Sequence, residues 1–382
     1  MKPYLLALCC LATFSNYFAQ PFAIGHRTLS LFDANRNRTV TAEVYYPALS
    51  TGDNVAFSTG SFPVFTLAHG FVIPGDTYQN FANELVPDGY VVVLPTTEGG
   101  FLPNHDAFGK DIAFLNNAFR SNGVDFFTQW NGRSAIGGHS MGGGASALAA
   151  TQTEADAYVG LAPAITNPSP VPLGAQIELP ALIFSGSGDA VTPPETNHQP
   201  IYDAFASSCK TFVSINSGTH CFYIPASLCD LGESGVPGGM TRELQQAITF
   251  DFLRPFLQTF LLDDTAAWQN FQQTLPTDNR ITYQQTCSID FTGLNSISGN
   301  DISLYPQPCI DLLNLKFNSA VKFNALAVYT IQGKHIEMLP EWVQNGDKVS
   351  ISIPPNMLAG IYIFEIQTNQ GVFRKRVQRA QP

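Results

Sequence analysis

The pentapeptide Gly138-His139-Ser140-Met141-Gly142 decides how the surrounding chain must fold. A partly apolar stretch that is poor in helix formers, residues 133–137, precedes it, and an alanine-rich stretch, residues 143–151, follows it. These flanks predict a buried strand that turns sharply into a helix, with glycines where side chains would collide. Such a turn exposes the Ser140 hydroxyl and directs the backbone N–H of Met141 toward the same place. The sequence therefore predicts a nucleophilic serine at position 140, with Met141 as an oxyanion donor.

Apolar runs and helical patterns alternate on both sides of this turn. Two further strands, split by a polar turn, are expected at residues 27–32 and 39–47. The other expected strands cover residues 62–68, 90–95, 158–163, 181–186 and 211–215, and the expected helices cover residues 76–85, 106–120, 195–207 and 238–262. This alternation predicts the α/β class, with a mostly parallel central sheet covered by helices.

An acid and a histidine follow later strands in the order that a nucleophilic serine on such a turn requires. Asp189 comes just after the run 181–186, and His220 lies on the loop after the last expected strand. The order Ser140, Asp189, His220 predicts a catalytic triad. In isolation, Asp189 also suits a turn or helix cap. Four other histidines compete less well because of their positions, namely His26, His105, His139 and His198.

The segment His69-Gly70-Phe71 follows the expected central strand 62–68. A glycine at this place, upstream of the serine turn, is where the second oxyanion donor is expected, and the Phe71 N–H would supply it. His69 is then expected to be structural, with its ring hydrogen-bonded to loop backbone.

These residue types predict acyl transfer to water. His220 would remove the Ser140 proton and later return it to the leaving group, while Asp189 would fix the imidazole tautomer. We expect no cofactor and no metal, because the sequence has no Cys-x-x-Cys or His-x-His spacing.

Three stretches resemble the α/β-hydrolase superfamily and, within it, the cutinase-like, dienelactone-hydrolase-like and chlorophyllase-like serine esterases. They are residues 69–71, residues 138–144, and residues 189–204 leading to His220. Bacterial cutinases and polyester hydrolases have a similar Ser-Met-Gly-Gly-Gly run, with Met as an oxyanion residue and an aromatic at the position of Phe71. The resemblance covers residues 25–260 and implies a secreted enzyme that cleaves carboxylic esters.

Three segments depart from the polyester-hydrolase pattern. Ala164 stands where those enzymes carry a Trp, which removes one wall of an aromatic-polymer clamp. Residues 71–95 are more similar to chlorophyllase, which implies a bulkier natural ester. The segment 221–229 matches neither group.

Composition and cysteine usage limit the compartment and the partners. The 382 residues carry a formal net charge of −11, so the sequence lacks the excess of positive charge that is typical of nucleic-acid binding proteins. Residues 1–20 read as a cleaved signal peptide whose apolar run is too short to span a bilayer. The mature chain would keep an odd number of cysteines, which leaves at least one unpaired. Two disulfides are expected among Cys209, Cys221, Cys229 and Cys287 in an unspecified pairing, with Cys309 outside them.

The C-terminal part changes to short alternating strands that suggest a small β-sandwich. Residues 304–308, 333–334, 358–362 and 374–376 resemble the sorting domain of type IX secretion cargo, which implies secretion machinery as a partner. A carbohydrate-binding or stalk module is the alternative. We expect a signal peptide at 1–20, a catalytic domain at 21–288, a linker at 289–301 and the β-sandwich at 302–382.

The sequence thus predicts a secreted serine esterase, released or held at the cell surface, that acts on an ester substrate. The triad alone leaves two alternatives open. One is a peptidase or amidase with the same residues, and the other is a non-catalytic binding protein on a hydrolase scaffold.

Overall fold

The computed structural model describes most of the chain from residue 21 onward. The described residues are 21–121, 123–225, 228–233, 239–287, 302–317, 322–330, 336, 341–355, 357–368 and 371–380. The expected signal peptide at 1–20 and the whole of the expected linker at 289–301 lie outside them.

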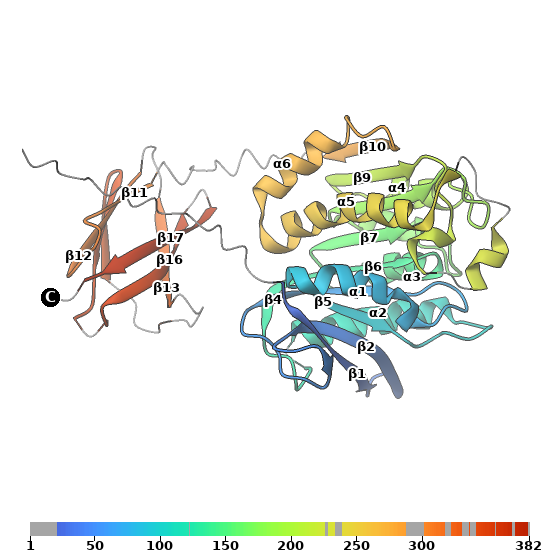
Figure 1. Cartoon of the computed structure of the whole chain (residues 1–382), viewed down its shortest axis with the longest axis horizontal. Coiled ribbons are helices and arrows are strands. Elements are labelled where there is room, and N and C mark those ends of the chain that lie inside the picture. Colours follow the sequence, from blue (N-terminus) through green and yellow to red (C-terminus); the bar gives the residue numbers. More distant parts are fainter. Residues whose placement is uncertain are drawn as a thin grey trace, which may run out of the picture.

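A ten-stranded sheet forms the larger body in the order β10-β9-β8-β7-β6-β4-β5-β2-β1-β3 (Figure 1). Its strands are β1 (Ala23–Asp33), β2 (Arg38–Ala48), β3 (Gly52–Asp53), β4 (Phe62–Ala68), β5 (Val91–Pro95), β6 (Trp130–His139), β7 (Ala157–Leu161), β8 (Ala181–Gly186), β9 (Cys209–Ile215) and β10 (Ile281–Cys287). The strands from β5 through β4 and β6 to β9 pair in parallel, and antiparallel strands flank them on both sides. This arrangement confirms the predicted α/β class.

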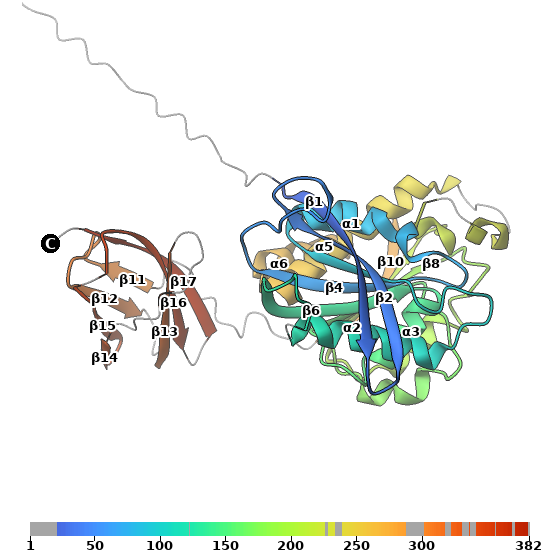
Figure 2. The ribbon, with the colours of Figure 1, turned by 90° about the horizontal axis from the view of Figure 1, so that it is seen from below.

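Helices cover both faces of this sheet. They are α1 (Gln79–Leu85), α2 (His105–Arg120), α3 (Met141–Ala149), α4 (His198–Ala204), α5 (Arg242–Leu262) and α6 (Thr265–Thr274). In Figure 2, α1, α5 and α6 lie on one side of the strands and α2 and α3 on the other. The central strands have two buried faces, so they are continuous apolar runs rather than alternating ones, as in β4 and β5.

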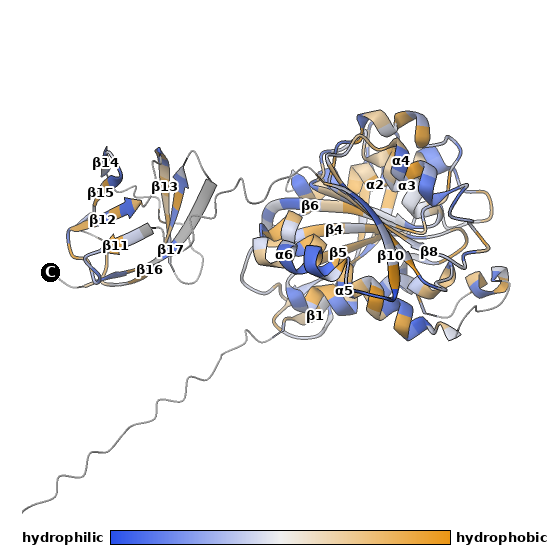
Figure 3. Ribbon diagram, turned by 90° about the horizontal axis from the view of Figure 1, so that it is seen from above, coloured by the Kyte–Doolittle hydropathy of each residue, from blue (hydrophilic) through white to orange (hydrophobic). Residues whose placement is uncertain are grey.

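The apolar cores correspond to these two faces. Phe65 and Leu67 of β4 belong to the core that includes α1 and α5, whereas Ala68 packs with Phe108 of α2 and Met141 of α3. Figure 3 shows the hydrophobic strands between helices whose outer sides are more polar. Neighbouring residues of one strand thus supply both cores, as the period-two geometry of a strand requires.

Two short antiparallel sheets make up the C-terminal body. One has the order β11-β12-β15-β14 and the other β13-β16-β17. The strands are β11 (Ile302–Tyr305), β12 (Leu312–Phe317), β13 (Phe323–Thr330), β14 (Glu341–Asn345), β15 (Lys348–Ser352), β16 (Gly360–Thr368) and β17 (Gly371–Arg379). Leu315 and Ile351 of the first sheet share one core with Val328 and Phe364 of the second. Two sheets facing across a single core form the predicted sandwich.

The cysteines pair as two disulfides. Cys209 is bonded to Cys287 and joins β9 to the edge strand β10, and Cys221 is bonded to Cys229. Cys309 is free and buried. The prediction of two disulfides that exclude Cys309 is confirmed. Among the described helices, none combines the length and the apolar character that a membrane crossing needs.

Candidate active site

The turn between β6 and α3 places Ser140 in a backbone conformation that few side chains adopt. Its φ is 53° and its ψ is −120°, and it is the N-cap of α3. A methyl group at Gly142 would overlap the carbonyl oxygen of Ala68, and one at Gly138 would overlap Gly142 itself. The two glycines are therefore required because β4, β6 and α3 meet here without room for side chains. A strained residue of this kind costs about 1–3 kcal/mol and must be held by its surroundings.

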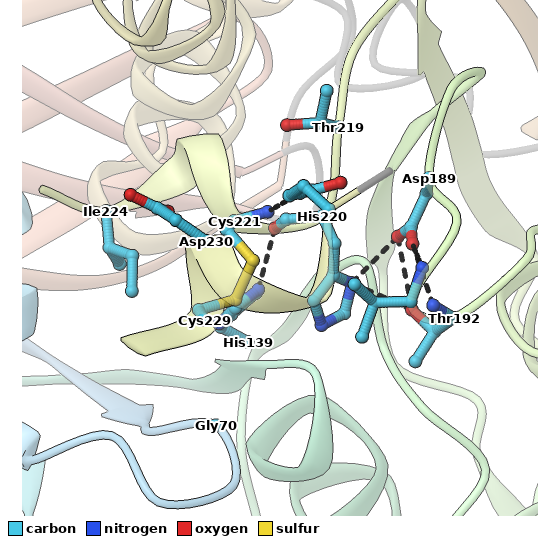
Figure 4. Close-up of a disulfide and its surroundings, with 12 residues drawn as sticks. Gly70, His139, Asp189, Thr192, Thr219, His220, Cys221, Ile224, Cys229 and Asp230 are labelled. Carbon is cyan, nitrogen blue, oxygen red and sulfur yellow. Dashed lines mark hydrogen bonds and ion pairs between the residues drawn. A yellow bond between two sulfur atoms is a disulfide. The ribbon is translucent and has the colours of Figure 1, made fainter. Parts of the chain in front are cut away.

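Asp189 and His220 are brought together as predicted. His220 Nδ1 lies 2.7 Å from Asp189 Oδ2, and both side chains are buried (Figure 4). The other carboxylate oxygen, Oδ1, accepts hydrogen bonds from the backbone N–H groups of Val191 at 2.9 Å and Thr192 at 2.7 Å. The carboxylate is thus held by its own loop, and the imidazole donates its Nδ1 proton to it.

The hydroxyl of Ser140 is at the same end of the sheet, but no hydrogen bond joins it to His220 among the described residues. The ring of the adjacent His139 lies 4.7 Å from the ring of His220, centroid to centroid. In unliganded enzymes this catalytic hydrogen bond is often long and tightens when substrate binds. The contact between Ser140 and His220 therefore stays a prediction.

A buried chain of hydrogen bonds connects the backbone at Gly70, the turn that carries Ser140 and the loop that carries His220. The N–H of Gly70 donates to Tyr78 Oη at 2.9 Å, and Tyr78 Oη lies 2.7 Å from His139 Nδ1. His139 Nε2 lies 2.9 Å from the carbonyl oxygen of His220. A carbonyl only accepts, so His139 carries its proton on Nε2, and its Nδ1 accepts a hydrogen bond from the Tyr78 hydroxyl. Burial lowers the pKa of His139 well below its usual value, in keeping with this neutral tautomer.

His69 has the structural role that the sequence predicts. Its Nδ1 lies 2.8 Å from the Gly70 carbonyl and its Nε2 lies 2.9 Å from the Thr97 carbonyl. Both contacts are to loop backbone, so the ring holds the segment that leads to Phe71. The Phe71 side chain is 49% exposed. Met141, by contrast, is buried as the first residue of α3, where a helix leaves its backbone N–H without an intrahelical partner.

The backbone on both sides of His220 is fixed by α5 and by a disulfide. Gln245 of α5 makes two 2.8 Å hydrogen bonds to the backbone of Thr219. On the other side, Arg242 donates to the carbonyl of Cys221 at 2.8 Å and forms an ion pair with Asp230. The Cys221–Cys229 bond closes the same loop (Figure 4). Sequence reasoning could not assign this segment, because these contacts depend on α5.

Two further groups lie beside the acid: His198, which the sequence analysis ranked below His220, and Thr192, which it did not single out. His198 is buried, with Nε2 at 3.5 Å from Asp189 Oδ2, and the Thr192 hydroxyl lies 3.0 Å from that nitrogen. Burial lowers the pKa of His198 to about 4, so the ring is neutral at neutral pH. The carboxylate oxygen of Asp189 and one ring nitrogen each of His198 and His220, atoms of the kind that bind metal ions, lie within 4.8 Å of one another. All three side chains are hydrogen-bonded: Asp189 to His220, and His198 to Ser185 and Thr192.

A mostly parallel sheet, a strained serine between strand and helix, an acid after β8 and a histidine after β9 define the α/β-hydrolase fold. Residues 19–238 match the family model described as PET hydrolase-like. That is more than half of the chain, which therefore belongs to the PET hydrolase-like family. The resemblance to cutinase-like hydrolases stated above is confirmed.

Two characterised relatives match parts of the chain. Bis(hydroxyethyl) terephthalate hydrolase of Streptomyces coelicolor is 27% identical over 184 residues, which are 46% of this chain and 54% of that protein. Cutinase est1 of Thermobifida alba is 33% identical over 90 residues, which are 23% of this chain and 29% of that protein. The chain thus spans about half of one relative and less than a third of the other.

The C-terminal body matches a second family. Residues 303–378 match the model described as Secretion system C-terminal sorting domain. A sorting domain of this kind directs export, so the chain is secreted or held at the cell surface.

Proposed function

We propose that this chain is a secreted serine hydrolase that cleaves carboxylic esters through an acyl-enzyme on Ser140. The observation that carries the proposal is the 2.7 Å hydrogen bond from His220 Nδ1 to the buried carboxylate of Asp189. With its Nδ1 proton committed to the acid, the imidazole is left with Nε2 as a proton acceptor, which is the form that activates a serine.

In the proposed reaction, His220 Nε2 takes the Ser140 proton while Oγ bonds to the ester carbonyl carbon. The carbonyl electron pair moves onto oxygen, and the N–H groups of Phe71 and Met141 donate to that oxyanion. The tetrahedral intermediate then collapses. The carbonyl double bond re-forms, the bond to the alcohol oxygen breaks, and the alcohol leaves with the proton from His220. Water then repeats the sequence on the acyl-enzyme and releases the acid.

The surroundings favour an apolar ester as substrate. Exposed apolar side chains occur on the loops after β4, β5, β7, β8 and β9, namely Phe71, Phe101, Leu102, Ile165, Val191, Leu228 and Leu231. The carboxyl ends of parallel strands share one edge of a sheet, which is where ligands of open α/β sheets bind. Beside the nucleophile, Ala164 donates its N–H to the Ser140 carbonyl at 2.9 Å. Its small side chain leaves space for a bulky acyl or alcohol group, and the names of the two relatives favour terephthalate esters or cutin-like substrates.

A fluorophosphonate probe tests the nucleophile directly. The wild-type chain should be labelled on Ser140 and the Ser140→Ala variant should not. Ser146→Ala is the matched control, because Ser146 lies in the same helix but is buried and donates to the Gly137 carbonyl; it should still be labelled. An unlabelled wild-type chain would favour the non-catalytic binding protein.

A substrate panel then separates an esterase from an amidase. p-Nitrophenyl esters of rising chain length, matched anilides and an insoluble polyester film should be compared for the wild-type and Ser140→Ala chains. Faster turnover of the anilides than of the esters would favour the amidase, and equal ester hydrolysis by both chains would refute the mechanism.

We further propose that residues 303–378 engage the secretion machinery and that the signal peptide at 1–20 starts export. In a host with type IX secretion, a chain that ends at residue 287 should remain inside the cell, whereas the full chain should reach the medium or the surface.

A further inference from the structure

His198 is a buried histidine that the proposed mechanism does not use. It begins α4, and its exposed fraction is 0%. Its Nδ1 lies 2.8 Å from Ser185 Oγ on β8. On the opposite side of the ring, Nε2 faces Thr192 Oγ1 at 3.0 Å and Asp189 Oδ2 at 3.5 Å. Two histidines therefore approach the same carboxylate oxygen, at 2.7 Å for His220 and 3.5 Å for His198.

The Thr192 hydroxyl lies between these groups. Its Oγ1 is 2.8 Å from His220 Nδ1, 3.1 Å from Asp189 Oδ2 and 3.0 Å from His198 Nε2. Figure 4 shows this threonine beside the bond from Asp189 to His220. One hydroxyl thus touches the acid and both imidazoles.

The protons in this cluster have a consistent arrangement. A carboxylate only accepts, so Asp189 Oδ2 receives the proton of His220 Nδ1 and that of the Thr192 hydroxyl. The hydroxyl oxygen can then accept from His198 Nε2–H, and His198 Nδ1 accepts from the Ser185 hydroxyl. In this arrangement His198 is neutral, and its only ring N–H donates a hydrogen bond to Thr192 and not to Asp189.

We propose that Thr192 is a positioning residue that keeps Asp189 bonded to His220 and prevents His198 from taking its place. This inference rests on the proposed function, since it assumes that the Asp189 to His220 bond orients the catalytic base. Without the hydroxyl, His198 Nε2–H would face Oδ2 with no competing acceptor, and a small ring shift would close the 3.5 Å gap. His220 would then share its carboxylate, lose its fixed tautomer and accept the serine proton less often.

The test compares Thr192→Val, which removes the hydroxyl at nearly constant shape, with Thr192→Ser, which keeps it. With a soluble p-nitrophenyl ester, Thr192→Val should lower kcat about tenfold with little change in KM, as for the loss of one hydrogen bond to a charged group. Thr192→Ser should stay within about threefold of wild type. Unchanged kcat in Thr192→Val, or an equal loss in both variants, would overturn the proposal.

A second experiment removes His198, the histidine that would compete for Asp189. In the Thr192→Val chain, a further His198→Phe change should return most of the lost kcat, so the two substitutions are non-additive. A double variant that folds but stays as slow as Thr192→Val would overturn the competition between the histidines.

A spectroscopic arm does not depend on turnover. The His220 Nδ1 proton on Asp189 should give a far-downfield proton NMR resonance that disappears in Asp189→Asn. It should shift or broaden in Thr192→Val and persist in Thr192→Ser, and an unaltered resonance in Thr192→Val would overturn the proposal. Failure of the proposed function is distinct, because it would appear as full activity of Ser140→Ala.

Discussion

Low pH should destabilise this protein through its buried histidines, and for His198 the loss of unfolding free energy can be calculated. Burial is the largest cause of its lowered pKa, the nearby Asp189 carboxylate opposes it, and the electrostatic influence of His220 lowers the pKa further. The folded value is about 4, against an ordinary value of 6.5. Between these two pH values the unfolded chain binds a proton at this ring and the folded chain does not. Stability therefore rises with pH across this window.

The size of the stability loss follows from the width of the interval between the folded and unfolded pKa values of His198. Each pH unit contributes about 1.4 kcal/mol, so His198 should remove about 3 kcal/mol of unfolding free energy as the pH falls from 6.5 to 4. Below pH 4 the ring is charged in both states and adds no further loss. Burial lowers the pKa of His69 and His139 as well, so the total acid loss should exceed this amount.

The assay is urea unfolding of the full chain at pH 7.5 and pH 4, followed by tryptophan fluorescence. A Trp342→Phe background removes the signal of the C-terminal sandwich and leaves Trp130 and Trp268. His198→Asn cannot take up a proton at this position, so its stability should fall about 3 kcal/mol less than that of the parent. Because His69 and His139 remain in both chains, their effects cancel. An equal fall in both chains, within about 1 kcal/mol, would refute the reasoning.

Three other substitutions test the framework of the site. Gly142→Ala should prevent soluble expression because its methyl overlaps the Ala68 carbonyl, whereas Gly100→Ala, with no atom within 4 Å, should express normally; normal yield of Gly142→Ala would contradict the turn geometry. Loop-closure entropy predicts a loss of roughly 4.5 kcal/mol for removing the Cys209–Cys287 disulfide, whose cysteines have a sequence separation of 78, and roughly 2.5 kcal/mol for the Cys221–Cys229 disulfide, with a separation of 8; the reverse order in urea unfolding would contradict this. Tyr78→Phe leaves the Gly70 N–H without its acceptor, which should cost about 1–3 kcal/mol and lower kcat more than it raises KM; unchanged kcat and stability would argue against the connection.

The sequence was sufficient for the elements that carry strong local signals. The continuous apolar runs of β4, β5 and β8 are found where they were expected, because strands buried on both faces need no alternation. The edge strand β10 was not recognised, since within Ile281–Cys287 only Ile281 is buried. α3 begins two residues earlier than expected, because it starts directly at the serine turn and not after the glycines.

Side-chain partners were predictable only where chain order implies them. Asp189 and His220 follow neighbouring parallel strands, so their meeting at one edge is a consequence of topology. The Tyr78 to His139 bond spans 61 residues, and no local pattern distinguishes this tyrosine from an ordinary core residue. The link depends on how α1 packs beside the serine turn, which is a tertiary result.

His198 shows where the rule of chain order stops. The rule of chain order selects His220 as the base because that histidine follows the last parallel strand. The 2.7 Å bond to Asp189 agrees with this choice. The rule does not explain why a second imidazole, 3.5 Å from the same oxygen, does not compete. Distance alone is a weak answer, because a ring rotation could remove a difference of this size. A hydroxyl that satisfies His198 while donating to the acid gives a specific answer, since each imidazole then has its own acceptor. The selectivity of the acid for one histidine thus depends on the side chain at position 192, outside the three residues that define the triad.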